Sequence, residues 1–165
     1  LPDDVAVLSA EEVDEGFHAR YDAVSRRYRY TILNREVRSA LLRRYAYFYP
    51  DELDVELMDE TAKLLLGRHD FSSFQKSGSA RKNPVCTVFD IGCRREGDFV
   101  ILEVSADSFL RGMVRAIVGT LIKLCKQGNP KEEMTRILQA RERSTAGMSV
   151  PPHGLCLVQV KYTEE

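Results

Sequence analysis

One arginine lies inside an apolar run that is otherwise typical of a buried helix. Arg115 occurs in the stretch FLRGMVRAIVGTL at residues 109–121, between Gly112 and Gly119. An unpaired charge removed from water is strongly unfavourable, so Arg115 needs an anionic partner. Glycine costs a helix interior about 0.5–1 kcal/mol relative to alanine, which favours close approach of another backbone or of a ligand. The run predicts either a strand packed on the helix, with a structural carboxylate holding Arg115, or an arginine that meets the anion of a functional site.

The helix that carries this arginine is expected over about residues 108–126, with its stop at Gly128. Arg111 and Arg115 would then lie one turn apart on the same face. A broad apolar surface covers much of the remainder, formed by Met113, Val114, Ile117, Val118, Leu121, Leu124 and Cys125.

A second stretch provides aromatic side chains at strand spacing. Residues 27–33, RYRYTIL, alternate polar with aromatic or aliphatic residues, which is the period of a half-buried strand. Tyr28 and Tyr30 would share one face of that strand, and Arg27 and Arg29 the other.

The remaining segments complete an α+β pattern. We expect extended segments or strands at residues 44–49, 85–94, 99–106 and 155–162, and helices at residues 53–66 and 130–141. Residues 68–84 are polar, basic and contain small residues, and we expect them to form a long connection that orders on a polyanion. The chain is therefore predicted to be a single domain, residues 1–165, in which helices pack on one face of an antiparallel β-sheet.

Charge is segregated along the chain although the net charge is only -1. Six acids and no base fall in residues 1–15, six further acids in residues 51–60, and eight arginines against two acids in residues 16–44. This pattern fits either an anion-binding face or solvated strand edges with lateral ion pairs. The preference for arginine over lysine favours phosphate recognition, because guanidinium binds phosphate through two parallel hydrogen bonds.

Other classes of site have no support in the sequence. The cysteines, Cys86, Cys93, Cys125 and Cys156, have no C-x-x-C spacing, and we expect each to be a small buried hydrophobe. The three histidines share no ligand spacing, and neither a glycine-rich phosphate loop nor a G-x-S-x-G motif occurs. We expect no metal and no cofactor. The acidic start and the lack of a long apolar run predict a soluble cytoplasmic protein.

Four strings in order along the chain carry a resemblance to a known family. They are FHARYDA leading into RRYRY at residues 17–30, LGRHDFSSF at 66–74, FLRGMVRAIVGTL at 109–121 and GLCL at 154–157. Together they resemble the tRNA pseudouridine synthase A family over nearly all 165 residues.

The resemblance implies a cofactor-free isomerase that converts uridine to pseudouridine in the anticodon stem-loop of tRNA, at tRNA positions 38–40, and that forms a homodimer. An essential aspartate acts there with a tyrosine that stacks on the base, a basic residue that pairs with the aspartate, and an apolar residue in the pocket. By position these three are Tyr28, Arg115 and Leu155. A flipped base needs an aromatic face, and a fixed guanidinium keeps a carboxylate ionised. The expected RNA-binding residues are Arg26, Arg29, Arg43, Arg44, Lys76, Arg81, Lys82 and Arg111.

The aspartate motif of the family, of the type Arg-Thr-Asp-x-Gly-Val-His, does not occur in this sequence. Asp70 belongs to the separate HDFSSF match and is not assigned as the catalytic aspartate. We therefore expect the chain to be the C-terminal domain of a longer enzyme, with residues 1–16 as a former inter-domain connection, and to be inactive alone. Two alternatives stay open: a non-catalytic RNA-binding domain, and an unrelated enzyme that uses Asp70 and His69 with Arg115.

Overall fold

The computed structural model describes residues 1–79 and 83–163. Its strands are β1 (Ser25–Leu33), β2 (Tyr47–Phe48), β3 (Gly67–Asp70), β4 (Val85–Glu96), β5 (Phe99–Ala106) and β6 (Leu155–Lys161). Its α-helices are α1 (Val55–Ala62), α2 (Met113–Leu124) and α3 (Pro130–Ala140), and its 3-10 helices are η1 (Leu42–Arg44), η2 (Lys63–Leu65), η3 (Ser72–Phe74) and η4 (Pro152–Gly154).

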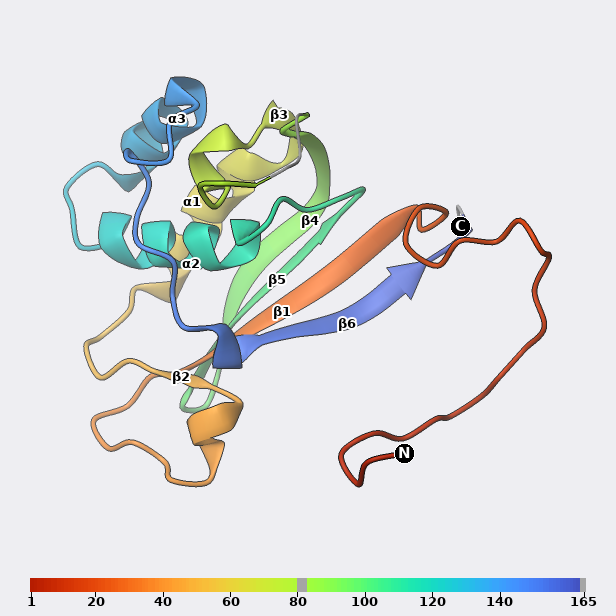
Figure 1. Cartoon of the computed structure of the whole chain (residues 1–165). Coiled ribbons are helices and arrows are strands. Elements are labelled where there is room, and N and C mark those ends of the chain that lie inside the picture. Colours follow the sequence, from red (N-terminus) through yellow and green to blue (C-terminus); the bar gives the residue numbers. More distant parts are fainter. Residues whose placement is uncertain (80–82, 164–165) are drawn as a thin grey trace.

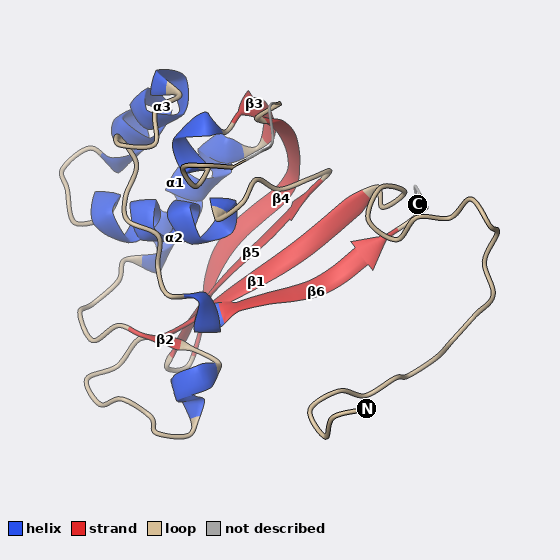
Figure 2. Ribbon diagram, in the orientation of Figure 1, coloured by secondary structure: helices blue, strands red, loops and turns tan. Residues whose placement is uncertain are grey.

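The six strands form one sheet in the order β2-β1-β5-β4-β3, and β6 pairs with β1 on the same side as β2, along an earlier part of the strand. All these pairings are antiparallel except that of β1 with β2, which is parallel. Figures 1 and 2 show the α-helices on one side of the sheet, near β3, β4 and β5, while β1 and β6 extend away from them. The predicted fold class is confirmed, with a sheet that is mostly antiparallel.

Strand β1 organises the sheet, because it pairs with β5 on one side and with β6 and β2 on the other. Its predicted alternation is confirmed. Tyr30 and Ile32 are fully buried in the core and Tyr28 packs against it, whereas Arg27 and Arg29 are exposed. The aromatic side chains therefore face the helices, and the arginines face the open side of the sheet.

Helix α2 is shorter than the sequence indicated, and this corrects one prediction. The helix begins at Met113, because Gly112 adopts a left-handed backbone conformation with φ of 77° at the N-cap. A helix interior does not accommodate that conformation. Arg111 consequently lies in the preceding turn rather than on the helix face that carries Arg115. Its carbonyl accepts a 2.8 Å hydrogen bond from the backbone N–H of Lys76, which ties the connection after η3 to the start of α2.

The segment at residues 68–84 contains more regular structure than predicted. Strand β3 pairs with the beginning of β4, and η3 follows it. Phe71 and Phe74 are fully buried and fix this part of the chain to the core. The strand was missed because Arg68, His69 and Asp70 are polar, and an edge strand with exposed side chains has no apolar alternation to reveal it.

Helix α1 starts at a side-chain cap. The Asp54 carboxylate accepts a 2.9 Å hydrogen bond from the backbone N–H of Leu57 and so satisfies one free donor of the first turn. The predicted helix over residues 53–66 ends in a 3-10 turn, η2, and Gly67 follows with φ of 92°. Gly67 therefore ends the helical region as expected and also begins β3.

The cysteine prediction is confirmed in part. Cys86 and Cys93 are buried, but Cys125 is only partly buried and Cys156 is exposed on β6. Strand β6 lies at the edge of the sheet, so its residues have fewer neighbours than those of β4. Residues 1–16 contain no helix or strand and run away from the rest of the chain (Figure 1). Their assignment as an inter-domain connection stays a prediction.

Ion pairs cross the open side of the sheet between three neighbouring strands. The Glu103 carboxylate on β5 contacts the Arg29 guanidinium on β1 at 2.7 Å and the Arg94 guanidinium on β4 at 2.9 Å. Partial burial alone would raise the pKa of Glu103, but hydrogen bonds from the two arginines hold that pKa below its usual value. Of the two interpretations of the charge pattern, lateral ion pairs between strands therefore apply to Arg29.

This arrangement predicts an acid-dependent contribution to stability. A carboxyl whose pKa is lowered in the folded state stabilises above its unfolded pKa, about 4.3, and loses that effect as pH falls through the folded pKa. We expect Glu103→Gln to flatten the fall in unfolding free energy below about pH 4.3, measured by urea denaturation at several pH values. Glu36→Gln, in an exposed loop, should leave the profile unchanged. An unaltered acid profile in Glu103→Gln would contradict the assignment.

Candidate active site

Two of the three predicted catalytic residues line one cavity. Tyr28 on β1 and Leu155 at the start of β6 both line a cavity of about 620 Å³. Their strands are antiparallel neighbours, and β1 is paired with β6 through a register shift between Arg27 and Tyr28. The extra residue of this irregularity is Val158 on β6, and beyond it Tyr28 lies opposite Leu157 and Tyr30 opposite Leu155.

The turn before α2 forms the opposite wall of this cavity. The Phe109 ring packs edge-to-face on the Tyr28 ring, with centroids 4.9 Å apart and planes at 82°. The backbone of Gly112 lies close by, and the remaining wall comes from the start of α2 and from the connection after η3. The full lining is Arg20, Tyr28, Gly78, Ser79, Phe109, Leu110, Arg111, Gly112, Met113, Val114 and Leu155.

The cavity combines an apolar interior with cationic side chains. Tyr28, Phe109 and Leu155 offer ring faces and aliphatic surface, and Arg20 and Arg111 add positive charge. A nucleotide has a planar base and an anionic phosphate, so this combination suits it. Sequence analysis gave no role to Arg20, although it occurs in the FHARYDA string eight residues before Tyr28. Only the fold places the two beside each other.

Arg115 is fixed by a backbone carbonyl. Its Nε donates a 2.6 Å hydrogen bond to the Val150 carbonyl, and the Val150 N–H donates a 3.2 Å bond to the Arg115 carbonyl. Within residues 1–79 and 83–163, no carboxylate pairs with Arg115, and Nη1 and Nη2 have no protein partner. The expected structural carboxylate is therefore not found in the described part of the chain, and a backbone segment holds the side chain instead.

Arg115 is only partly buried and does not line the cavity that contains Tyr28, although its neighbours Met113 and Val114 do. The positive charge of Arg115 influences the pKa of Tyr30, the second tyrosine of β1. Burial raises the pKa of Tyr30, the nearby Tyr47 raises it further, and the Arg115 guanidinium opposes both effects. The Tyr30 hydroxyl donates a 2.7 Å hydrogen bond to the Pro151 carbonyl, next to the carbonyl that holds Arg115.

Among the expected RNA-binding residues that the structure describes, Arg26 and Arg29 use their guanidinium groups within the fold. Arg26 donates to the carbonyls of Ala23 at 2.7 Å and Asp107 at 2.6 Å, and also to the carbonyl of Arg20. This use of its guanidinium leaves little capacity for phosphate. Arg29 pairs with Glu103 on the open side of the sheet, away from Tyr28.

The other expected RNA-binding residues are exposed where the structure describes them. Arg43 and Arg44 lie in η1, which contacts η4 just before Leu155. Lys76 and Arg111 are exposed beside the turn before α2, where the side chain of Lys76 approaches Gly112. Arg81 and Lys82 lie outside the described residues. Their RNA-binding roles stay predictions.

The alternative site at Asp70 lies elsewhere. Asp70 and His69 line a separate cavity of about 260 Å³ together with residues of α3. The Asp70 carboxylate accepts hydrogen bonds from the backbone and the hydroxyl of Ser72 and contacts Arg141 Nε at 3.5 Å. Neither residue lines the cavity of Tyr28 and Leu155. Asp70 instead caps a turn, and the enzyme based on it has no geometric support.

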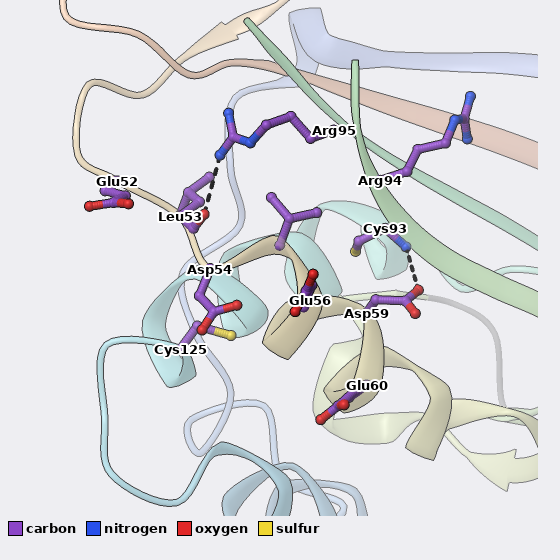
Figure 3. A pocket seen from close by; sticks show the side chains of 11 residues that line it. Glu52, Leu53, Asp54, Glu56, Asp59, Glu60, Cys93, Arg94, Arg95 and Cys125 are labelled. Carbon is purple, nitrogen blue, oxygen red and sulfur yellow. Dashed lines mark hydrogen bonds between the residues drawn. The ribbon is translucent and has the colours of Figure 1, made fainter. Parts of the chain in front are cut away.

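A larger cavity of about 940 Å³ lies between α1, β4 and the end of α2 (Figure 3). Its acids include Glu52, Asp54, Glu56, Asp59 and Glu60. Asp54 caps α1, and the Asp59 carboxylate accepts a 2.9 Å hydrogen bond from the backbone N–H of Cys93. Figure 3 also shows Arg95 directed to the Leu53 carbonyl, at 3.2 Å. This concentration of carboxylates repels phosphate. A nucleic-acid site is therefore favoured at the cavity of Tyr28 and Leu155.

The described residues were also considered for metal-binding groups and for membrane-spanning helices. They contain no group of three or more histidine, cysteine or acidic side chains placed to hold a metal ion. None of their helices has the length and apolar character required to cross a membrane.

Comparison with known proteins identifies the family of this chain. The model of the family described as tRNA pseudouridine synthase matches residues 61–163. "tRNA pseudouridine synthase A 2" of Clostridium perfringens is 46% identical over 162 residues, covering 98% of this chain and 66% of the relative. "tRNA pseudouridine synthase A" of Acetivibrio thermocellus is 44% identical over the same shares, and that of Shewanella amazonensis is 40% identical over 99% of this chain and 63% of its own length.

The fold thus defines an α+β domain with a mostly antiparallel sheet and a cavity lined by aromatic and cationic side chains. The chain belongs to the tRNA pseudouridine synthase family. It spans about two thirds of the length of the relatives that it matches.

The partners of Arg26 predict a structural role for this side chain. Arg26→Ala leaves carbonyls of Ala23 and Asp107 without their charged donor, and should lower the unfolding free energy by about 1–3 kcal/mol. Urea denaturation of the chain, followed by circular dichroism, measures this loss. Arg44→Ala is the matched control, because Arg44 is exposed in η1, and its effect should stay within about 0.5 kcal/mol. Equal losses in the two variants would contradict the assignment.

Proposed function

We propose that this chain supplies one wall of the active site of a tRNA pseudouridine synthase that isomerises uridine to pseudouridine in the anticodon stem-loop. The observation that carries the proposal is the meeting of Tyr28 and Leu155 in a cavity with cationic residues at its wall. The names of the relatives support the reaction class.

The proposed reaction breaks the bond between ribose C1′ and uracil N1 and rejoins C1′ to uracil C5. The C5 proton leaves and N1 gains a proton, so substrate and product are isomers and no oxidant or reductant is needed. The uridine must first leave its base stack, which costs a few kcal/mol. Tyr28 offers a ring face to the flipped base, Phe109 fixes that ring edge-to-face, and Leu155 packs against the base from β6.

Arg115 is proposed to pair with the catalytic aspartate. Its Nη1 and Nη2 have no protein partner in the described part of the chain, so both can receive a carboxylate in a two-bond geometry. Such a pair lowers the pKa of the carboxyl and keeps it ionised near the base. The aspartate motif is absent from these 165 residues, and we place the aspartate in the part of the relatives that this chain does not cover.

The tRNA would reach this cavity across exposed cations. Arg20 and Arg111 lie at the cavity, Lys76 is beside it, and Arg43 and Arg44 lie near η4. These side chains are proposed to hold phosphates, and Arg81 and Lys82, which lie outside the described residues, are proposed to bind RNA as well. Each phosphate contact releases counterions, so binding should weaken as salt rises. A homodimer and a cytoplasmic location are expected for the full-length enzyme.

The proposal predicts that the 165-residue chain alone does not turn over. Without the aspartate no group in the cavity can assist departure of the base from C1′. With tRNA tritiated at uracil C5, the chain should release no tritium, whereas the enzyme at the full length of its relatives should release it. Tritium release by the isolated chain would show that the catalytic group lies within these residues. No release by the full-length enzyme on any tRNA would favour the alternative of a non-catalytic RNA-binding domain.

Within the full-length enzyme, Arg115→Ala should lower kcat by about 10²- to 10³-fold, the usual loss when one electrostatic hydrogen-bond donor of an active site is removed. The Kd for tRNA should change little, because Arg115 is outside the exposed cationic surface. Tritium release measures kcat, and filter binding measures Kd. Circular dichroism shows whether the variant folds, and unfolding of Arg115→Ala would assign Arg115 to structure instead.

A further inference from the structure

The segment between α3 and η4 crosses α2 in direct backbone contact. We call residues 142–151 the strap. A Cβ added at Gly119 of α2 would lie 1.8 Å from the Met148 carbonyl oxygen, and one added at Gly147 would lie 2.7 Å from the Gly119 carbonyl oxygen. Neither glycine can be replaced without a shift of backbone. The two glycines thus fix where the strap crosses the helix.

Polar contacts on both sides of this crossing hold the strap in place. The Thr120 hydroxyl, which is fully buried, accepts a 2.8 Å hydrogen bond from the Gly147 N–H and donates a 2.7 Å bond to the Ala116 carbonyl. Arg143 donates to the Gly147 carbonyl at 2.9 Å and to the Ser149 hydroxyl at 3.3 Å. The strap is therefore tied to α2 and cross-linked within itself.

The position of the strap decides the position of the Arg115 guanidinium. Val150 follows the crossing directly, and its carbonyl accepts the Arg115 Nε at 2.6 Å. The Val150 N–H returns a 3.2 Å bond to the Arg115 carbonyl, and the next carbonyl, that of Pro151, accepts the Tyr30 hydroxyl at 2.7 Å. Three bonds therefore join α2, β1 and the strap at one point.

An arginine side chain has many rotamers, and ordinary surface arginines retain this conformational entropy. Here the charged Nε–H bond to Val150 restrains the plane of the guanidinium, while Nη1 and Nη2 have no protein partner in the described part of the chain. A group held in its productive orientation before the reaction contributes to rate without further ordering.

We propose that the strap is a positioning element for catalysis and that Thr120 and Arg143 are positioning residues, which act on Arg115 through Gly147 and Val150. This inference rests on the proposed function, because it assigns the strap to the reaction in which Arg115 takes part. Neither residue lines the cavity of Tyr28 and Leu155, so neither is assigned a contact with the base.

The test uses the full-length enzyme and compares Thr120→Val with Thr120→Ser. Valine keeps the shape but removes the oxygen that accepts from Gly147, whereas serine keeps the oxygen. We expect Thr120→Val to lower kcat about tenfold with KM for tRNA unchanged, and Thr120→Ser to restore kcat to within about twofold of the wild type. Rates are measured by tritium release at a temperature at which circular dichroism shows every variant folded.

Arg143→Ala provides a second variant that leaves the buried face of α2 intact. It should also lower kcat several-fold with KM unchanged, whereas Arg136→Ala should have no effect. Arg136 is the matched control because it is an exposed arginine of α3 that pairs only with Glu133 in the described part of the chain.

The outcomes separate this inference from the proposed function. An inactive wild-type enzyme would overturn the proposed function. An active wild type with unchanged kcat in folded Thr120→Val and Arg143→Ala would overturn the positioning role and leave the proposed function standing. A rise in KM alone would also overturn it, because it would assign the strap to tRNA binding. A fall in kcat that serine restores supports the inference.

Discussion

The backbones of α2 and of the strap touch at Gly119 and Gly147, and the arrangement of the candidate site depends on this contact. A side chain at either position would separate the two segments. With the contact in place, Val150 reaches Arg115, Pro151 reaches Tyr30, and the chain enters η4 and β6 beside β1. Leu155 and Tyr28 then line the same cavity. Close packing of two backbones thus sets the relative positions of a helix, a central strand and an edge strand.

The arginines of this protein divide into two groups by their partners. Arg26 is bonded to carbonyls and Arg29 to a carboxylate, so their charges are neutralised or occupied within the fold. Arg43, Arg44 and Arg111 are exposed near the cavity or near η4, and they give a protein of almost neutral net charge a local cationic surface. The acids gather around the larger cavity near α1 (Figure 3). Charges are only partly separated in the fold, because Arg94 and Arg95 of β4 line this cavity together with the acids.

Much of the secondary structure could be predicted from local pattern. The alternation in β1 and the strands at residues 85–94 and 99–106 depend on neighbouring residues, so their signals are visible in sequence. The start of α2 and the presence of β3 could not be predicted in this way. Gly112 takes a left-handed conformation that its apolar surroundings do not reveal, and β3 is an edge strand whose polar side chains hide its pairing with β4. Arg20 was missed at the site for a related reason, since nothing local indicates which strand it approaches.

The sequence by itself determined the α+β class, the family resemblance and the need of Arg115 for a partner, because these depend on residue types and spacing. The two glycines around Arg115 also indicated a close approach, without saying of what. The tertiary structure decided that a backbone carbonyl, rather than a carboxylate, holds Arg115 within the described residues, and that Gly119 meets the strap. It also decided which of the described arginines have partners within the fold. These outcomes depend on contacts between residues far apart in the chain, and only the packed fold brings such residues together.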